Sequence, residues 1–355
     1  MNKFFIVTIL LVSVSLHGCT QEMSAPDTTA TFFNKSPQQT SDRLFITELQ
    51  DLQTAYLDSM EIFGVSGIQS NADFLILGDS RQKTIHRILT SDLTLYDSFQ
   101  LNEGNGPGEI MALNDFDSTA EQIAIYDGRS RKVLISGLDG TLRNEFRLND
   151  QFPHRLTLLT DGRLLIFSTI VISNPFLFTE MDLDGQPYSS FLEVPNPEEH
   201  NSIEFVGYLS ADNHNHIYYA GYPESILKKY DRDGTLIFSR TTIDNFSSEK
   251  NYMTLRADEG MIARGYTDDA LFAFVDIDVW DDYLITVPHH NGDADYKYID
   301  IYSAQSGDYL GTLNTWGFPN KITADDDFIY VFESRSGTRT LKKYPNNLHE
   351  WFSGQ

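Results

Sequence analysis

A short strand-forming motif recurs six times along this chain, and it constrains the fold more than any other feature. In each copy, a polar turn precedes four or five apolar residues that are rich in β-branched and aromatic side chains, which favour strands. A second strand follows. The six apolar segments are Phe74–Gly78, Ile123–Tyr126, Leu164–Phe167, Ile217–Ala220, Tyr283–Thr286 and Phe328–Phe332. Their spacing of roughly 40–70 residues predicts an all-β chain, a six-bladed β-propeller whose blades each contain four antiparallel strands.

A tight turn is expected in the second half of each module. The predicted turns are Asp139-Gly140, Asp184-Gly185, Asp233-Gly234, Ser306-Gly307, Asn346-Asn347 and, with a weaker signal, Ser91-Asp92. Asp-Gly between two strands is a strong hairpin signal because primed turns require positive φ angles. A β-sandwich would not repeat with this phase. Seven blades or another all-β fold are the remaining alternatives.

The last module lacks an obvious fourth strand, because the chain ends soon after Trp351. The segment Leu44–Leu49 precedes the first module and is predicted to supply that strand. Closing the ring in this way removes the strand edges that an open ring would expose. The propeller is therefore assigned to residues 42–355.

One long insertion, at about Asp244–Asp269, separates the fourth module from the fifth. Its Ser247-Ser248-Glu249 start and the spacing of Tyr252, Met253 and Leu255 favour a helix. The insertion connects an outer strand to the next inner strand, and such connections lie on the face that usually holds a propeller's binding site. It is either a lid or partner-docking element, or a decorative addition.

The N-terminus has the pattern of an export signal. Lys3 precedes an apolar segment from Phe4 to Leu16, which has the length of a signal-peptide core. The following Leu16-His17-Gly18-Cys19 resembles the lipobox of bacterial lipoproteins, although His17 occupies a place usually held by a smaller residue. The resemblance implies that residues 1–18 are removed and that Cys19 carries lipid. The alternative is an ordinary signal or uncleaved anchor with an incidental cysteine.

Composition indicates further properties of the chain and of its location in the cell. Residues 19–41 lack periodicity and are rich in Thr, Ser, Gln and Pro, so they are predicted to form a flexible tether. The single cysteine excludes an intramolecular disulfide. A net charge of −25 argues against nucleic-acid binding, because such a surface repels phosphate. We expect an exported monomer that meets the membrane through its lipid alone, on the outer membrane, with the periplasmic or surface side unresolved.

A glycine-rich segment carries a second resemblance. Gly104-Asn-Gly-Pro-Gly-Glu109, followed by Ile123–Asp127 and Arg131–Leu134, resembles an NHL repeat. The whole exported chain resembles the TolB-like six-bladed propeller lipoproteins of Bacteroidota, a family that implies fold and address but no general reaction. Because the segment lacks the Lys-Ser/Thr of a phosphate-binding loop, its residues are expected to shape an inter-blade turn. These structural residues are Gly104, Gly106, Pro107, Gly108 and Glu109.

Three modules place an arginine two residues after an acid, just behind the apolar strand. The pairs are Asp79 and Arg81, Asp127 and Arg129, and Glu333 and Arg335. They could form a ring of anion-binding guanidinium groups on one face. The more ordinary interpretation is that each acid caps its turn and each arginine pairs locally.

The histidines form two clusters, at His214-Asn-His216 and at His289-His290. These clusters are predicted to lie on opposite faces of the ring. A shared zinc site is therefore disfavoured, because zinc needs three or four converging ligands.

Residues that enter the innermost strands should line the central tunnel. Propeller hydrolases of the lactonase and phosphotriesterase kind, which this fold resembles, hold calcium there with oxygen ligands. The corresponding residues are Asn114, Asp115, His154, Arg155, Val206, Gly207, Asp276, Asn320 and Lys321. Asn114, Asp115, Asp276 and Asn320 could bind calcium, but Arg155 and Lys321 disfavour it. No Gly-x-Ser-x-Gly elbow or Ser/His/Asp order indicates nucleophilic catalysis.

The favoured function is a non-catalytic binding or interaction module of the cell envelope. We expect the ligand to sit at the tunnel mouth beneath the insertion, and no cofactor other than possible calcium. Charge for an anionic group would come from Arg155, Lys321 and the arginines at 81, 129 and 335, and aromatic faces from Tyr252 and Tyr266. The partner would be an envelope protein or a small anionic or carbohydrate ligand. The alternatives are a metal-dependent hydrolase or lyase, and a scaffold for other envelope proteins.

Overall fold

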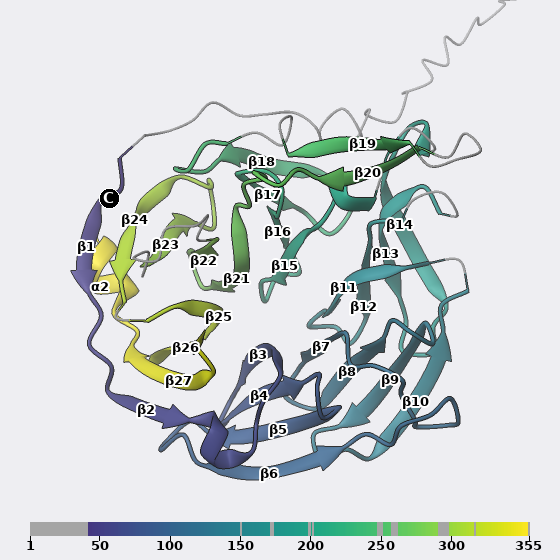
Figure 1. Ribbon diagram of the computed structural model, residues 1–355, viewed down its shortest axis with the longest axis horizontal. Helices are drawn as coiled ribbons and strands as arrows, with labels where there is room; N and C mark the ends of the chain where they lie inside the picture. The colour runs from purple at the N-terminus through teal and green to yellow at the C-terminus, as the bar shows by residue number, and fades with distance from the viewer. Residues whose placement is uncertain are drawn as a thin grey trace, which may run out of the picture.

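The computed structural model describes residues 42–149, 151–170, 174–197, 200, 202–246, 251–256, 262–289, 298–315 and 317–353. Within these ranges the chain forms six β-sheets arranged in a ring (Figure 1). Each blade contains four antiparallel strands, and blade 5 has one extra strand. The predicted six-bladed propeller is therefore confirmed. Cys19 and the predicted signal and tether lie outside the described residues.

In every blade the first strand lies nearest the ring axis and later strands lie further out (Figure 1). Blade 1 contains β3 (Val65–Asn71), β4 (Phe74–Asp79), β5 (Thr84–Leu89) and β6 (Leu95–Gln100), and blade 2 contains β7 (Asp115–Ser118), β8 (Gln122–Asp127), β9 (Lys132–Gly137) and β10 (Leu142–Arg147). Blade 3 contains β11 (Pro153–Leu158), β12 (Leu164–Ser168), β13 (Phe176–Met181) and β14 (Pro187–Glu193). Blade 4 contains β15 (Gly207–Ala211), β16 (Ile217–Gly221), β17 (Ile226–Tyr230) and β18 (Leu236–Thr241). Blade 5 contains β21 (Phe274–Trp280), β22 (Tyr283–Pro288), β23 (Tyr298–Ser303) and β24 (Tyr309–Asn314). Blade 6 contains β25 (Pro319–Ala324), β26 (Phe328–Arg335), β27 (Thr338–Pro345) and, outermost, the N-terminal strand β2 (Gln53–Tyr56).

The six predicted apolar segments are the second strands of the six blades, namely β4, β8, β12, β16, β22 and β26. They are unbroken apolar runs because neighbouring blades cover both of their faces. Between blades 3 and 4, for example, Phe167 and Phe178 pack with Phe205 and Tyr230, and all four side chains are fully buried. The hydrophobic core is therefore divided among the blade interfaces.

The hairpin turns differ from the predicted primed turns. At four of them φ is positive at the glycine and not at the residue before it, which matches a type I turn followed by a left-handed residue. Each of these glycines also faces a phenylalanine of the preceding blade's outer strand, so that a Cβ would lie about 2.5 Å or less from the ring. The pairs are Gly140 with Phe99, Gly185 with Phe146, Gly234 with Phe191 and Gly307 with Phe238. Glycine thus permits both the turn and the packing of one blade on the next.

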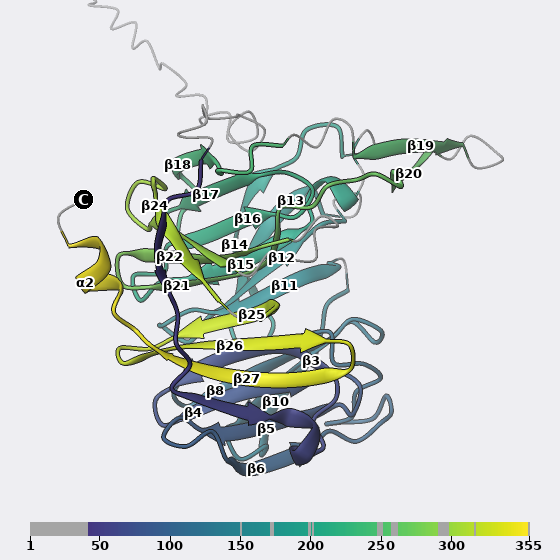
Figure 2. The same cartoon turned by 60° about the vertical axis from the view of Figure 1, so that its left-hand side comes forward.

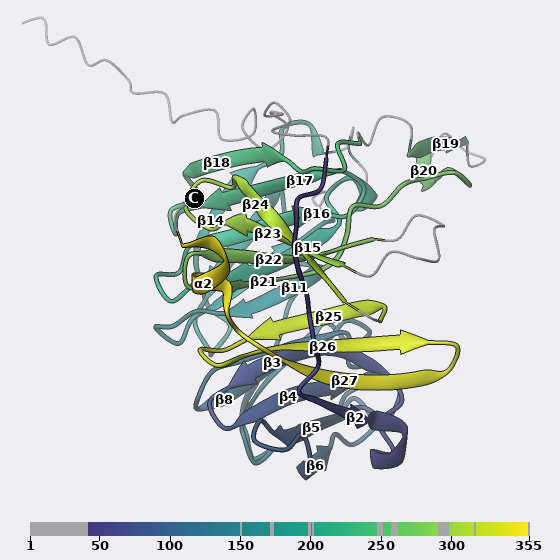
Figure 3. The same ribbon diagram turned by 90° about the vertical axis from the view of Figure 1, so that its left-hand side faces the viewer.

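An N-terminal strand closes the ring, but it is not the predicted one. Strand β2 (Gln53–Tyr56) pairs antiparallel with β27 as the fourth strand of blade 6. The predicted segment instead forms β1 (Phe45–Glu48), which pairs in parallel with β24 along the outside of blade 5 (Figure 3). Arg43 explains the difference, because its guanidinium binds Asp300 of blade 5 at 2.9 Å and Asp244 at 2.7 Å.

Two further elements correct the sequence interpretation. Asn346-Asn347 is not a hairpin turn but leads into a helix, α2 (Leu348–Phe352), whose Leu348 and Phe352 are buried against blade 5. Short 3-10 helices occur at η1 (Leu57–Met60) and η3 (Ser202–Glu204). Throughout the described part of the chain, no helix combines the length and the apolar character needed to cross a membrane.

The insertion forms a hairpin rather than the predicted helix. Strands β19 (Tyr252–Arg256) and β20 (Ile262–Tyr266) pair antiparallel, with Tyr252 opposite Tyr266. Over five residues the apolar spacing cannot separate a helix from a strand, and the deciding partner strand lies further along the chain. The hairpin projects from the face that also carries the β26–β27 turn, which we call the hairpin face (Figure 2).

We predict that the glycine–phenylalanine contact stabilises the ring beyond the demands of the turn. Gly234 and Gly162 both have φ of 82°, but a Cβ at Gly162 would meet nothing within 4 Å. Gly162→Ala should therefore lose only the backbone preference, about 1–2 kcal/mol of unfolding free energy. Gly234→Ala should lose a further ~1–3 kcal/mol, because its methyl group collides with Phe191. Urea unfolding of both variants measures the difference, and equal losses would show that the contact contributes nothing.

Candidate functional site

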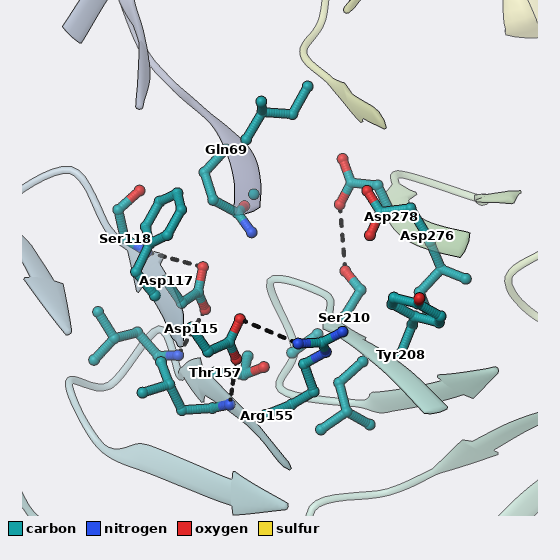
Figure 4. A pocket seen from close by; sticks show the side chains of 18 of the residues that line it. Gln69, Asp115, Asp117, Ser118, Arg155, Thr157, Tyr208, Ser210, Asp276 and Asp278 are labelled. Atoms are coloured by element: carbon teal, nitrogen blue, oxygen red, sulfur yellow. Dashed lines mark hydrogen bonds and ion pairs between the residues drawn. The ribbon is translucent and has the colours of Figure 1, made fainter. Parts of the chain in front are cut away.

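A central channel runs between the first strands of all six blades and contains a cavity of about 500 Å³. Its walls are formed by β3, β7, β11, β15, β21 and β25. Figure 4 shows polar side chains from several of these strands pointing towards one another across the cavity. This volume lies in the range of small-molecule sites, and the channel is therefore the candidate binding site.

Strand register places equivalent residues in two rings around the channel. In each blade the first strand pairs with the second. First-strand residues that lie opposite the same position of the second strand therefore occupy equivalent places around the channel. The first set, which we call the mouth ring, contains Gly67, Asp115, Arg155, Tyr208, Asp276 and Lys321. The second set, two residues further along each strand and called the inner ring, contains Gln69, Asp117, Thr157, Ser210, Asp278 and Thr323. The mouth ring lies nearer the hairpin face, because first strands run away from that face.

An Asp-x-Asp pair occupies both rings in blade 2 and again in the opposite blade 5. Asp115 and Asp117 accept hydrogen bonds from the backbone N–H groups of Leu156 and Leu158 in blade 3, at 2.9 and 2.7 Å. In the same way, Asp276 and Asp278 accept from the backbone N–H groups of residues 322 and 324 in blade 6, at 2.9 and 3.0 Å. These four carboxylates tie neighbouring blades together at the channel wall.

Both cations of the mouth ring are paired with acids of the preceding blade. Arg155 lies 3.7 Å from Asp115, and Lys321 lies 3.3 Å from Asp276. Both cations also lie over the ring of Tyr208, at 4.9 and 5.1 Å from its centroid. The predicted tunnel residues Asp115, Arg155, Asp276 and Lys321 are thus brought together, but their charges largely cancel.

The inner-ring acids hold their protons more tightly than ordinary aspartates. Burial raises the pKa of Asp117 to about 7 and that of Asp278 to about 6, although backbone N–H groups that bind both carboxylates oppose the shift. Neighbouring carboxylates of the channel contribute to both of these raised pKa values. Asp117 near neutral pH, and Asp278 at slightly acidic pH, can therefore donate as well as accept a hydrogen bond.

Aromatic side chains continue from Tyr208 towards the hairpin. Tyr222 lies 6.3 Å from Tyr208 and stacks on Phe272 at 4.4 Å between ring centroids. Tyr266 of the hairpin packs edge-on against Phe272 at 5.0 Å, and His289 lies 5.4 Å from the same ring. We call these half-buried residues, Tyr222, Tyr266, Phe272 and His289, the aromatic shelf. The predicted Tyr266 therefore lies beside the channel mouth, whereas the side chain of Tyr252 is outside the described structure.

The three predicted arginines do not line the channel cavity. Arg81 and Arg129 are exposed at the turns between second and third strands. Their partner acids cap those turns, since Asp79 accepts from the backbone N–H of Arg81 at 2.9 Å and Asp127 from that of Arg129 at 3.0 Å. Arg335, also exposed, has its guanidinium 4.1 Å from the ring centroid of Phe318.

The two predicted asparagine ligands also lie away from the cavity lining. The side-chain oxygen of Asn114 accepts from the backbone N–H of Gly128 at 2.7 Å, and the amide of Asn320 donates to the carbonyl of Phe318 at 2.8 Å. In the described ranges, no group of three or more His, Cys, Asp and Glu side chains is placed to hold a metal ion.

The histidines next to the channel strands serve other surfaces. Burial, together with the adjacent charge of Arg155, lowers the pKa of His154 to about 3. His216 binds Asp212 at 2.8 Å in a separate pocket that His214 also lines, while His289 belongs to the aromatic shelf. His290 lies outside the described residues.

The glycine-rich segment forms a compact loop held by glutamates. The backbone N–H of Gly106 donates to Glu109 at 2.7 Å, and that of Gly108, where φ is 71°, donates to Glu145 at 2.7 Å. The buried ammonium of Lys132 donates to the carbonyl of Gly106 at 2.9 Å. Gly104 and Pro107 belong to the same turn, just before blade 2 begins. Its polar groups thus bind the protein itself.

Asp117, Asp278, Ser210 and, of the shelf residues, Tyr222 and Phe272 were missed by the sequence interpretation. Alternation along a strand supplies the missing signal for the two acids, because a residue two positions after a channel-lining residue must face the channel too. The Asp-x-Asp pattern at both positions could therefore have been recognised. Tyr222 and Phe272 carry no such signal, since only the fold brings the end of β16 beside the approach to β21.

Comparisons with known proteins agree with the fold. The sequence profile of a family described as "6-bladed beta-propeller" matches residues 32–269. A Bacteroides fragilis protein described as exported has a TM-score of 0.53 at 14% identity, covering 85% of this chain and 99% of its own. Catalytically inactive virginiamycin B lyase from Staphylococcus aureus, solved with quinupristin, has a TM-score of 0.50 at 12% identity, covering 84% and 99%. At these identities the likeness concerns the fold alone. No curated protein matches the chain.

We predict that Asp117 makes the protein less stable as pH rises. An unfolded aspartate releases its proton near pH 3.9, whereas folded Asp117 does so at about 7. Between these values only the folded chain holds the proton, so its contribution to the unfolding free energy falls as pH increases. The expected fall is on the order of 1–3 kcal/mol from pH 4 to 8, after a discount for solvent screening at the cavity wall. Asp117→Asn should abolish it in urea titrations.

Asp139 provides a control of opposite sign. Hydrogen bonds from Thr141 lower the pKa of this exposed turn aspartate. Its stabilising contribution is therefore present at neutral pH and is lost as pH falls below its ordinary range. Asp139→Asn should accordingly lose stability at neutral pH only. Parallel pH profiles for wild type and Asp117→Asn would contradict the assignment of Asp117.

Proposed function

Since this chain belongs to the family of six-bladed β-propellers, we propose that it is a lipid-anchored binding protein of the bacterial cell envelope whose ligand enters the central channel from the hairpin face. The channel carries this proposal. Its cavity is lined by all six first strands, and side chains of opposite charge, hydroxyl groups and an amide converge in it (Figure 4). A lining of this kind suits selective binding of a small polar molecule.

The aromatic shelf supports entry at the hairpin face. Tyr222, Phe272 and Tyr266 extend from the mouth ring to the hairpin, and all three are only half-buried. Exposed aromatic groups beside a polar cavity offer a ligand an apolar surface next to its hydrogen-bonding partners. The insertion thus contributes Tyr266 directly to the proposed site.

The cell-envelope location rests on the N-terminal sequence. The Leu16–Cys19 pattern resembles a lipobox, and residues 20–41 have the composition of a tether. The Bacteroides fragilis protein that shares the fold is described as exported, which is consistent with the same compartment.

Catalysis has less support than binding. Among the residues that the structure describes, no histidine lines the channel cavity. The inner-ring acids are each bound by a backbone N–H group of the next blade, which gives them a structural role. A purely binding function requires nothing more of these groups.

We predict that filling the channel abolishes ligand binding without unfolding the ring. Gln69 points into the cavity from β3 (Figure 4), so Gln69→Trp should occupy the space while leaving the inter-blade hydrogen bonds in place. Gln100→Trp, on the exposed outer strand β6, is the matched control. Thermal unfolding with a panel of sugars, organic acids and metal ions should reveal a compound that raises Tm of wild type and Gln100→Trp only.

Two results of that screen would overturn the proposal. An equal increase in Tm for all three proteins would place binding elsewhere. No increase with any compound, with an envelope protein captured equally by all three, would indicate an interaction scaffold instead.

We predict that Cys19 is the site of lipidation. Cells fed an alkyne-tagged fatty acid should incorporate the label into the wild-type protein and not into Cys19→Ala. Intact mass should show that residues 1–18 are missing from the wild type. A wild-type protein that keeps these residues and carries no label would instead have an uncleaved anchor.

A further inference from the structure

We propose that the channel binds a neutral carbohydrate chain, one of whose sugar rings packs on the aromatic shelf. This inference rests on the proposed function and specifies its ligand. Three independent observations lead to it: the charge balance of the cavity, the mixture of hydrogen-bond donors and acceptors around it, and the position of the shelf.

Charge balance argues against an anionic ligand. The two rings contain four aspartates, at positions 115, 117, 276 and 278, against the two cations Arg155 and Lys321. Both cations are already paired with acids of the mouth ring. A carboxylate or phosphate would have to break these ion pairs and then face the released aspartates. Displacing one partner of a partly buried ion pair is unfavourable, because it leaves the other charge without compensation in a poorly solvated place.

The same geometry argues against a cationic ligand. An ammonium group that binds Asp115 or Asp276 would have to break that acid's ion pair with Arg155 or Lys321 and then face the released cation. Both like charges lie within the mouth ring, where they are only partly exposed and are poorly screened. A ligand without net charge avoids both penalties.

The cavity lining can form hydrogen bonds with ligand groups that act both as donors and as acceptors. Each ring aspartate uses an oxygen for a backbone N–H, and a carboxylate has further lone pairs for a hydroxyl donor. Ser210 donates to Asp278 at 3.3 Å, Thr157 lies in the same ring, and Gln69 adds an amide with both functions. Sugar hydroxyls both donate and accept, so a mixed lining suits them better than a lining of one kind.

The aromatic shelf supplies an apolar surface, which hydrogen bonds to sugar hydroxyls cannot provide. Sugar rings have apolar C–H faces, which pack on aromatic rings that remain accessible to solvent. Tyr222 and Phe272 stack at an interplanar angle of 13°, and Tyr222 lies next to Tyr208 of the mouth ring. One sugar could therefore lie on the shelf while its neighbour in the chain reaches the mouth ring.

The test compares oligosaccharides of equal length that differ in charge. Calorimetric titration of the intact protein would use maltohexaose, cellohexaose and xylohexaose as neutral probes, hexagalacturonate as the anion and chitosan hexamer as the cation. We expect at least one neutral probe to bind at least tenfold more tightly than both charged probes. Tyr222→Leu, which keeps apolar volume but removes the stacked ring, should weaken that binding at least tenfold. Gln100→Trp should bind as wild type does, and Gln69→Trp should not bind.

The outcomes separate this inference from the proposed function. A charged probe that binds more tightly than every neutral one, and whose binding Gln69→Trp abolishes, would overturn the inference and keep the channel as the site. The absence of binding by all neutral probes to the folded wild type would also overturn it. Neutral binding that Gln69→Trp leaves intact would overturn both. Neutral binding unaffected by Tyr222→Leu would remove the shelf from the site.

Discussion

The burial of each blade's second strand between two neighbouring blades is the interaction on which the rest of the structure depends. An isolated four-stranded sheet of this composition would expose apolar side chains on both faces, and only the adjacent blades cover them. The ring is therefore stable only when it is complete, which explains why the N-terminal strand β2 crosses over to finish blade 6. The repeated contact between a hairpin glycine and the preceding blade's phenylalanine reinforces the same interfaces at their outer edge.

This constraint also explains which features the sequence could predict. Second strands have a local signal, because burial on both faces demands an unbroken apolar run, and all six were located to within three residues at each end. The closing strand had no such signal. Both β1 and β2 are short, and the choice between them depends on Arg43 meeting Asp300, which is 257 residues away in the chain. The insertion was misread for a related reason, since its strands are defined only by each other.

In the candidate site, too, some features could be predicted from the sequence and others could not. Asp115, Arg155, Asp276 and Lys321 were placed at the tunnel correctly, because their position follows from where each first strand begins. Their pairing across blades could not be read from the sequence, and it changes the chemistry from a cationic site to a nearly balanced one. The arginines at positions 81, 129 and 335 shared a local pattern, but that pattern reflects turn capping at Asp79 and Asp127. The repeated acid–x–arginine pattern therefore indicated a shared turn structure, and it did not indicate that the three arginines lie close together.

Opposite blades carry matching residues along much of the channel wall, and the one pair of blades that does not match makes the candidate site asymmetric. Blades 2 and 5 carry the Asp-x-Asp pairs, and blades 3 and 6 carry Arg155 and Lys321, so opposite positions match. Blades 1 and 4 do not match, because Gly67 faces Tyr208 across the mouth ring. A side chain at Gly67 would meet Phe116, so this position remains small. The mouth is therefore open on the side of blade 1 and aromatic on the side of blade 4. Since Tyr222 and, through it, Tyr266 of the hairpin adjoin Tyr208, the aromatic groups at the mouth gather on the side of blade 4, and this asymmetry distinguishes one side of the mouth from the other.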